Sequence, residues 1–89
     1  MNKLRRKNLS KLIEKLEELQ ETVQALTEEL ETLRDEEQEY LDNIPENLQS
    51  SERYERAETA VDALDGAVSD LEYIDIESVI DQINEAINA

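Results

Sequence analysis

The chain contains no cysteine and no histidine, and these two absences exclude several kinds of chemistry. Without cysteine, the protein has no disulfide framework, no thiolate zinc site and no cysteine nucleophile. Without histidine, it lacks the side chain that serves most often as a metal ligand and as a general base. The commonest catalytic and metal-binding groups are therefore missing from the sequence.

Aromatic residues, glycine, proline and long apolar runs are also scarce. Aromatic residues make up 3% of the 89 residues, and there is one glycine and one proline. This composition favours helices over strands and turns. No segment approaches the run of roughly 20 apolar residues that crosses a membrane, and no apolar segment of a signal peptide follows the basic start. We therefore expect an all-α cytoplasmic protein that makes no contact with a membrane.

Apolar residues in the first half of the chain repeat at spacings of alternately three and four residues. The series is Leu9, Leu12, Leu16, Leu19, Val23, Leu26, Leu30, Leu33, Glu37, Tyr40 and Ile44. Only Glu37 breaks the apolar pattern, which is typical of a coiled coil. It predicts a first helix over about 4–43, which ends where Pro45 excludes the helical conformation of the residue before it.

A second helix is predicted after a connector over residues 44–50. Ser50 or Ser51 can cap its N-terminus, so that the helix covers about 51–88. Its apolar seam begins with Tyr54, Ala57, Val61, Leu64, Val68 and Leu71. These positions match the first seam when the two helices run in opposite directions. The sequence thus predicts an antiparallel two-helix coiled-coil hairpin that forms a single domain, 1–89.

The match between the two seams shifts by one residue beyond Leu71. From Ile76 onward the pairing resumes, so one extra residue lies within 72–76. A π-bulge would absorb this residue and keep the second helix continuous. The alternative is a true break, with Asp75 as the N-cap of a third helix. We favour the bulge, because the pairing resumes at once in phase.

Further apolar residues lie beside the seam, where a two-helix hairpin is not expected to cover them. They include Ile13, Ile74, Ile80 and Ile87. Exposed apolar stripes usually mark partner surfaces, and 89 residues are near the lower limit for a self-sufficient core. We therefore predict that these residues join two hairpins into a homodimer with a four-helix bundle. A hairpin rarely offers a concave pocket, so we expect a non-enzymatic protein with no catalytic, cofactor or metal site.

Charge is distributed unevenly along a chain of net charge −15. Residues 1–15 hold six basic side chains and one acidic one, whereas residues 16–89 hold three basic and 23 acidic ones. The basic end could contact nucleic acid or a membrane surface. Alternatively, antiparallel pairing places Lys11 and Lys15 beside the carboxylates of the second helix, which are Glu77, Asp81 and Glu85. We favour this internal neutralisation and expect no direct nucleic-acid binding, because an acidic chain binds phosphates poorly.

Acidic residues also form columns that point away from the seam. Glu28, Asp35 and Asp42 belong to such a column on the first helix. The favoured interpretation is a solvated face on an interaction protein that associates with itself and binds a protein partner, for example a basic protein surface. The alternative is a DNA mimic that inhibits a host or defence nucleic-acid-binding protein, since duplex DNA carries one charge per about 1.7 Å.

Two adjoining segments carry a resemblance to other proteins. They are IPENLQSSERYERAE, residues 44–58, and AVDALDGAVSDL, residues 60–71. Both resemble segments of small acidic helical proteins from Firmicute genomes, prophages and phages. The resemblance implies a phage or mobile-element setting without an established activity, so no functional residue carries over. It favours the DNA-mimic hypothesis modestly, because phages use small acidic proteins against host nucleic-acid-binding machinery.

Overall fold

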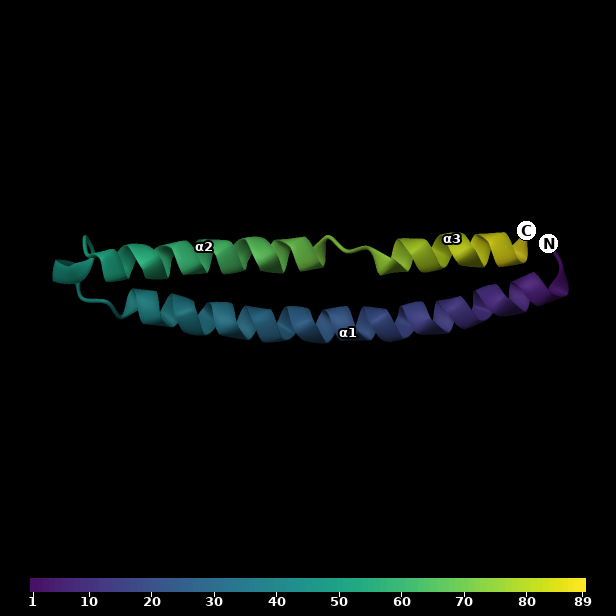
Figure 1. Ribbon diagram of the computed structural model, residues 1–89, viewed down its shortest axis with the longest axis horizontal. Coiled ribbons are helices and arrows are strands. Elements are labelled where there is room, and N and C mark those ends of the chain that lie inside the picture. The colour runs from purple at the N-terminus through teal and green to yellow at the C-terminus, as the bar shows by residue number, and fades with distance from the viewer. The chain divides into compact units, whose positions relative to one another are not determined.

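The computed structural model describes all residues, 1–89, and contains only helices. In chain order these are α1 (Lys3–Asp42), the 3₁₀ helix η1 (Glu46–Leu48), α2 (Glu52–Glu72) and α3 (Ile76–Asn88). The all-α class and the hairpin-like arrangement predicted from the sequence are confirmed (Figure 1). The chain divides into two compact units. Unit 1 comprises Met1–Ala25 and Ile74–Ala89, and unit 2 comprises Leu26–Tyr73.

Unit 2 is a hairpin in which α2 returns along the C-terminal part of α1 (Figure 1). The short connector is closed by backbone hydrogen bonds, among them one that the Leu48 amide donates to the Pro45 carbonyl at 2.9 Å. Ser51 then caps α2, and its side chain accepts a hydrogen bond from the Tyr54 amide at 3.2 Å. Such a cap satisfies one of the free amides at the start of a helix.

The core of unit 2 lies close to the connector. It consists of Leu41, Ile44, Ala57 and Val61, with Tyr54 packed against them. Val68 is a further buried residue on α2. The buried core of unit 2 therefore lies mainly at the closed end of the hairpin.

The second helix is broken, and the predicted π-bulge is wrong. α2 ends at Glu72 and α3 begins at Ile76, with Asp75 as N-cap. The Asp75 carboxylate accepts a hydrogen bond from the Ser78 amide at 3.0 Å. A capped restart satisfies an amide that would otherwise lack a partner, and it places negative charge at the positive end of α3. The alternative considered from the sequence, a true break at Asp75, is the one observed.

Unit 1 joins α3 to the N-terminal part of α1 (Figure 1). Its buried core is Ile13, Ile76 and Ile80. Around this core pack Leu16, Val23, Ile83 and Ile87. Polar contacts join the same two elements: the Gln20 amide donates to Glu77 at 3.1 Å, and the Arg6 guanidinium donates to the Ala89 carbonyl at 3.4 Å. The two chain ends therefore lie beside each other.

The seam of α1 differs from the predicted one in every second position. The less exposed side chains form the series Leu9, Ile13, Leu16, Gln20, Val23, Thr27, Leu30, Arg34, Glu37, Leu41 and Ile44, with Glu31 and Gln38 beside it. The observed seam keeps the predicted column that includes Leu9 and Leu30. The other predicted column, which starts at Leu12, is replaced by the column one residue further along the chain, which starts at Ile13. The exchange buries Ile13, lets Gln20 donate a hydrogen bond to α3 and lets Arg34 form an ion pair with α2.

Candidate functional site

The isoleucines predicted to lie outside the hairpin are mostly inside it. Ile13 and Ile80 are 8% and 6% exposed in the core of unit 1, and Ile87 packs against that core. Only Ile74, 50% exposed, remains at the surface. The expectation that a hairpin leaves Ile13 and Ile80 uncovered is therefore wrong, because α1 turns its Ile13 side toward α3. Ile13 and Ile80 are therefore not available to a partner in this structure.

A different apolar surface is exposed instead, and we call it the leucine column. It consists of Leu12, Leu19, Leu26, Leu33 and Tyr40. These side chains are 40% to 56% exposed. Each lies seven residues from the next on one uninterrupted helix, and seven residues make almost two full turns, so the column follows one face of α1. The sequence signal for these residues was clear, but it was interpreted as the intrachain core.

In unit 2 the leucine column borders an apolar hollow. The hollow is lined by Leu26, Glu29, Leu30, Leu33 and Leu71. Leu71 comes from α2, so the hollow lies where α1 and α2 meet. Its four leucines surround a space that an apolar side chain of another helix could fill, as a knob fills a hole in a coiled coil. A second shallow hollow beside it is lined by Glu29, Thr32 and Leu33.

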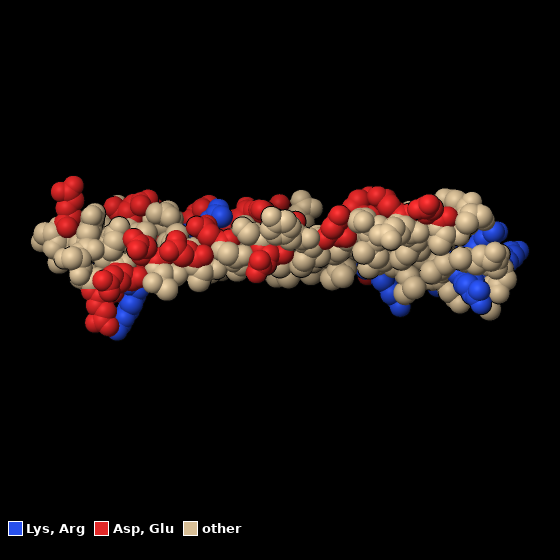
Figure 2. Space-filling model, turned by 90° about the horizontal axis from the view of Figure 1, so that it is seen from above, with Lys and Arg blue, Asp and Glu red and all other residues tan.

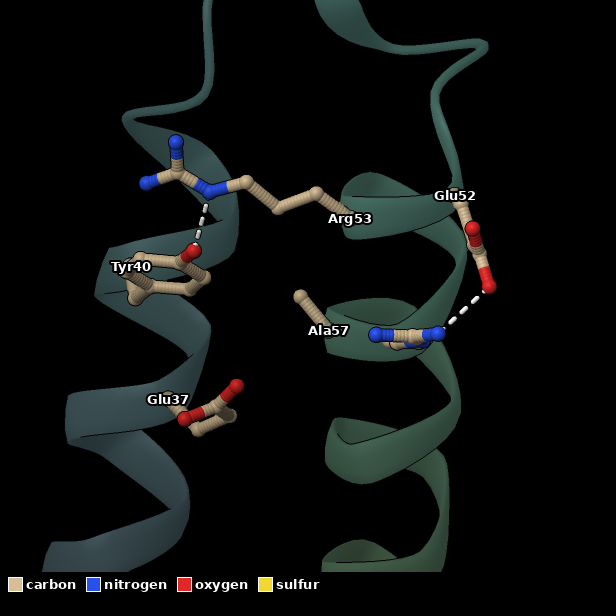
Figure 3. Close-up of a pocket in the computed structure, with 6 residues that line it drawn as sticks. Glu37, Tyr40, Glu52, Arg53 and Ala57 are labelled. Atoms are coloured by element: carbon tan, nitrogen blue, oxygen red, sulfur yellow. Dashed lines mark hydrogen bonds and ion pairs between the residues drawn. The ribbon is translucent and has the colours of Figure 1, made fainter.

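One end of the column in unit 2 carries a group of charged and aromatic residues (Figure 3). Arg53 reaches from α2 to α1, where it donates a hydrogen bond to the Tyr40 hydroxyl and lies 5.1 Å from the ring centroid. Glu37 and Ala57 face each other across the same space, while Arg56 pairs with Glu52 on the outer side of α2. Arg53 fixes the tyrosine ring by a cation–π contact, so Tyr40 presents a defined surface.

The acidic column of α1 is exposed and partly hydrogen-bonded within the helix. Asp35 accepts from Arg34 at 3.2 Å, and Asp42 accepts from Gln38 at 2.9 Å, whereas Glu28 is exposed. Arg34 also reaches Asp65 on α2 at 3.3 Å. The hydrogen bond to Asp35, together with the charges of Asp35 and Asp65, raises the pKa of Arg34 above its ordinary value. Arg34 therefore stays charged and links the two helices of unit 2.

The basic side chains near the N-terminus are exposed (Figure 2). They are Lys3, Arg5, Arg6, Lys7, Lys11 and Lys15. Figure 2 shows Lys and Arg gathered at the part of unit 1 that carries both chain ends, and Asp and Glu spread over the visible face of α2. The three ion pairs of the chain involve Arg34 and Arg56. The predicted direct neutralisation of Lys11 and Lys15 by α3 is therefore not observed, and Glu77 accepts from Gln20 instead.

Comparison with known proteins adds no family to this description. No protein-family model, curated protein or solved structure matches the chain. The resemblance to small acidic proteins of Firmicutes and phages stays a hypothesis. No group of three acidic side chains is placed to hold a metal ion, and none of the helices has the length and apolar character needed to cross a membrane.

Proposed function

We propose that the protein is a non-enzymatic interaction protein that binds an amphipathic α-helix along the leucine column. The observation that carries this proposal is the exposure of five large side chains, Leu12 to Tyr40, at an unbroken seven-residue spacing. A partner helix matches such a repeat over its whole length when it carries apolar residues at the same period. The repeat therefore indicates a helix as the bound element.

The exposure of the column side chains supports the proposal. Five large side chains at 40% to 56% exposure leave apolar surface uncovered along α1. Burying the exposed half of each column side chain contributes on the order of 1 kcal/mol to the free energy of binding. The hollow beside Leu33 offers further apolar contacts to a bound helix.

A synthetic helical peptide tests the proposal. The probe is a labelled four-heptad peptide with leucine at the two seam positions and lysine at the flanking positions, and binding is followed by fluorescence anisotropy. We expect the natural chain to bind it and Leu26→Glu to weaken binding at least about tenfold, since the substitution puts a charged group into the apolar seam of the complex. Leu26 is 48% exposed, so we expect the variant to keep its helices.

Gln24→Glu is the matched control, because it adds the same charge at an exposed position on another side of α1. Circular dichroism checks that both variants keep the helical content of the natural chain. Equal affinity of Leu26→Glu and Gln24→Glu would refute binding along the leucine column.

The exposed acidic column supports a second candidate, the DNA mimic. Glu28, Asp35 and Asp42 present carboxylates at regular intervals along α1. The test is binding to a set of purified basic DNA-binding domains. If the protein is a DNA mimic, its binding to these domains should weaken with added salt and be competed by duplex DNA. The binding should be lost when the three residues are replaced by lysine. Binding that survives all three treatments would contradict mimicry.

A further inference from the structure

We infer that the helix bound by the leucine column is α1 of a second copy of this chain, running antiparallel and centred on Leu26. This inference rests on the proposed function and names its partner. It differs from the dimer predicted from the sequence, since that dimer would join the copies through isoleucines of which the structure buries Ile13 and Ile80.

The leucine column is self-complementary about its centre. It has five members at equal intervals, and Leu26 is the middle one. When two copies of α1 run antiparallel with Leu26 beside the partner's Leu26, Leu19 lies beside the partner's Leu33. At the ends, Leu12 lies beside the partner's Tyr40. Every column side chain then has an apolar neighbour, as a two-fold interface between identical surfaces requires.

The charges of α1 select the antiparallel direction. Residues 3–15 carry six basic side chains and one acidic one. Residues 37–42, at the other end of α1, carry three acidic side chains and no basic one, and the connector over 43–49 adds one acidic side chain. Antiparallel pairing about Leu26 places these two segments beside each other at both ends of the interface. Parallel pairing would place each segment beside its own copy, with like charges facing each other. The opposite charges therefore favour one direction and oppose the other.

The basic side chains are accessible for these contacts. All six are exposed, none of them forms an ion pair within the chain, and Arg6 alone donates a hydrogen bond, to the Ala89 carbonyl. The hollow of unit 2 supplies the matching apolar contact. Its leucines at 26, 30, 33 and 71 surround the place where the partner's Leu19 would lie in this register. Charge and shape thus favour the same register.

Disulfide cross-linking tests the register directly, because the chain has no cysteine and each variant then carries one thiol. Leu26→Cys should form a covalent dimer on mild oxidation, since residues on the two-fold axis come within disulfide distance. Leu19→Cys alone should cross-link no faster than the control Gln24→Cys. A mixture of Leu19→Cys with a longer, tagged Leu33→Cys chain should yield the mixed dimer.

Rapid cross-linking of Leu19→Cys to itself would overturn the antiparallel arrangement. Cross-linking of Leu26→Cys no faster than that of Gln24→Cys would overturn the self-association. If the natural chain is also monomeric by sedimentation equilibrium but binds the leucine heptad peptide, the second copy is wrong and the proposed function stands. If it does neither, both proposals fail.

A charge exchange provides an independent test. Lys15→Glu should raise the dimer dissociation constant at least about fivefold, and so should Glu39→Lys. In the antiparallel register the two positions lie near each other across the interface, so the double variant, which keeps the natural net charge, should recover most of the lost affinity. Additive losses in the double variant would contradict the antiparallel pairing.

Discussion

At the residue scale, Arg34 shows how a charged side chain fits in a helix–helix seam. Its side chain is 27% exposed, and its guanidinium reaches Asp65 on α2 and Asp35 on α1. Arginine suits this position because its long stem is apolar and its head can remain solvated. The same position in an all-leucine seam would attract any apolar helix. Arg34 therefore makes the intrachain pairing of unit 2 specific.

Gly66 lowers the stability of α2 relative to an alanine at the same position, and no contact in the structure requires a glycine there. It lies within α2, and a Cβ atom built on it meets nothing within 4 Å. Replacing it with alanine should raise the free energy of unfolding by about 1 kcal/mol, because alanine loses less backbone entropy in a helix. Urea unfolding measures the change. Ala63→Gly, at an exposed position of the same helix, should lower stability by a similar amount.

A gain from Gly66→Ala well below the loss from Ala63→Gly would contradict the view that Gly66 has no structural role. Such a result would indicate that the absence of a side chain at Gly66 matters, for example for a partner that approaches the helix backbone closely.

At the scale of the elements, the caps define where helices begin. Ser51 starts α2 and Asp75 starts α3, each by accepting a hydrogen bond from the amide three residues later. The sequence narrows the first cap to Ser50 or Ser51, and the structure shows Ser51. The continuing apolar spacing favours an unbroken helix over a cap at Asp75, and the structure shows the cap. The apolar spacing resumes in phase after the break because α3, like α2, packs on α1. This spacing does not show whether the backbone between α2 and α3 is helical.

Asp75→Ala should destabilise α3 selectively. The substitution removes the only side-chain cap of α3, and we expect a loss of about 1 kcal/mol. Asp75→Asn should lose less, since its carbonyl oxygen can still accept from the Ser78 amide. Urea unfolding of the two variants gives the difference. Equal losses in both variants would indicate that the charge, and not the hydrogen bond, stabilises the start of α3.

The choice of seam on α1 explains what the sequence could not decide. The predicted column and the observed one share Leu9 and Leu30 and differ in the neighbour on each turn. At the two ends of α1 both solutions are apolar, because Ile13 takes the place of Leu12 and Leu41 that of Tyr40. In the middle of α1 the observed seam has polar residues where the predicted one has leucines, so apolar spacing alone favours the wrong solution. The choice depends on tertiary contacts, such as the packing of Ile13 against Ile80, that no local pattern encodes. The candidate site was missed for the same reason.

At the scale of the whole molecule, net charge opposes compaction and association. The chain carries a net charge of −15, and in the proposed dimer the central acidic segments of α1 would face each other. In that dimer the apolar column would have to supply the attraction, and the charges at the ends of α1 would select the direction.

Added salt should stabilise the protein. Raising the ionic strength from about 20 mM to about 500 mM shortens the Debye length severalfold and screens the repulsion among carboxylates. We expect the melting temperature, followed by circular dichroism at fixed protein concentration, to rise by several degrees, and Gly66→Ala to show the same rise. A melting temperature independent of salt would show that self-repulsion is not a significant part of the free energy of unfolding.

Because the helix is broken at residues 73–75, we expect α3 to unfold without unfolding α2, which the end of a continuous helix could do less readily. A helix of 13 residues is marginal in water on its own, so its order depends on the core it forms with Ile13. Amide hydrogens of α3 should therefore exchange through a local opening, at a lower free energy than those of α2. Hydrogen exchange resolved by residue measures both values. Each such opening would expose Ile13 and Leu16, so that the chain would transiently display a second apolar face with a different arrangement of branched side chains.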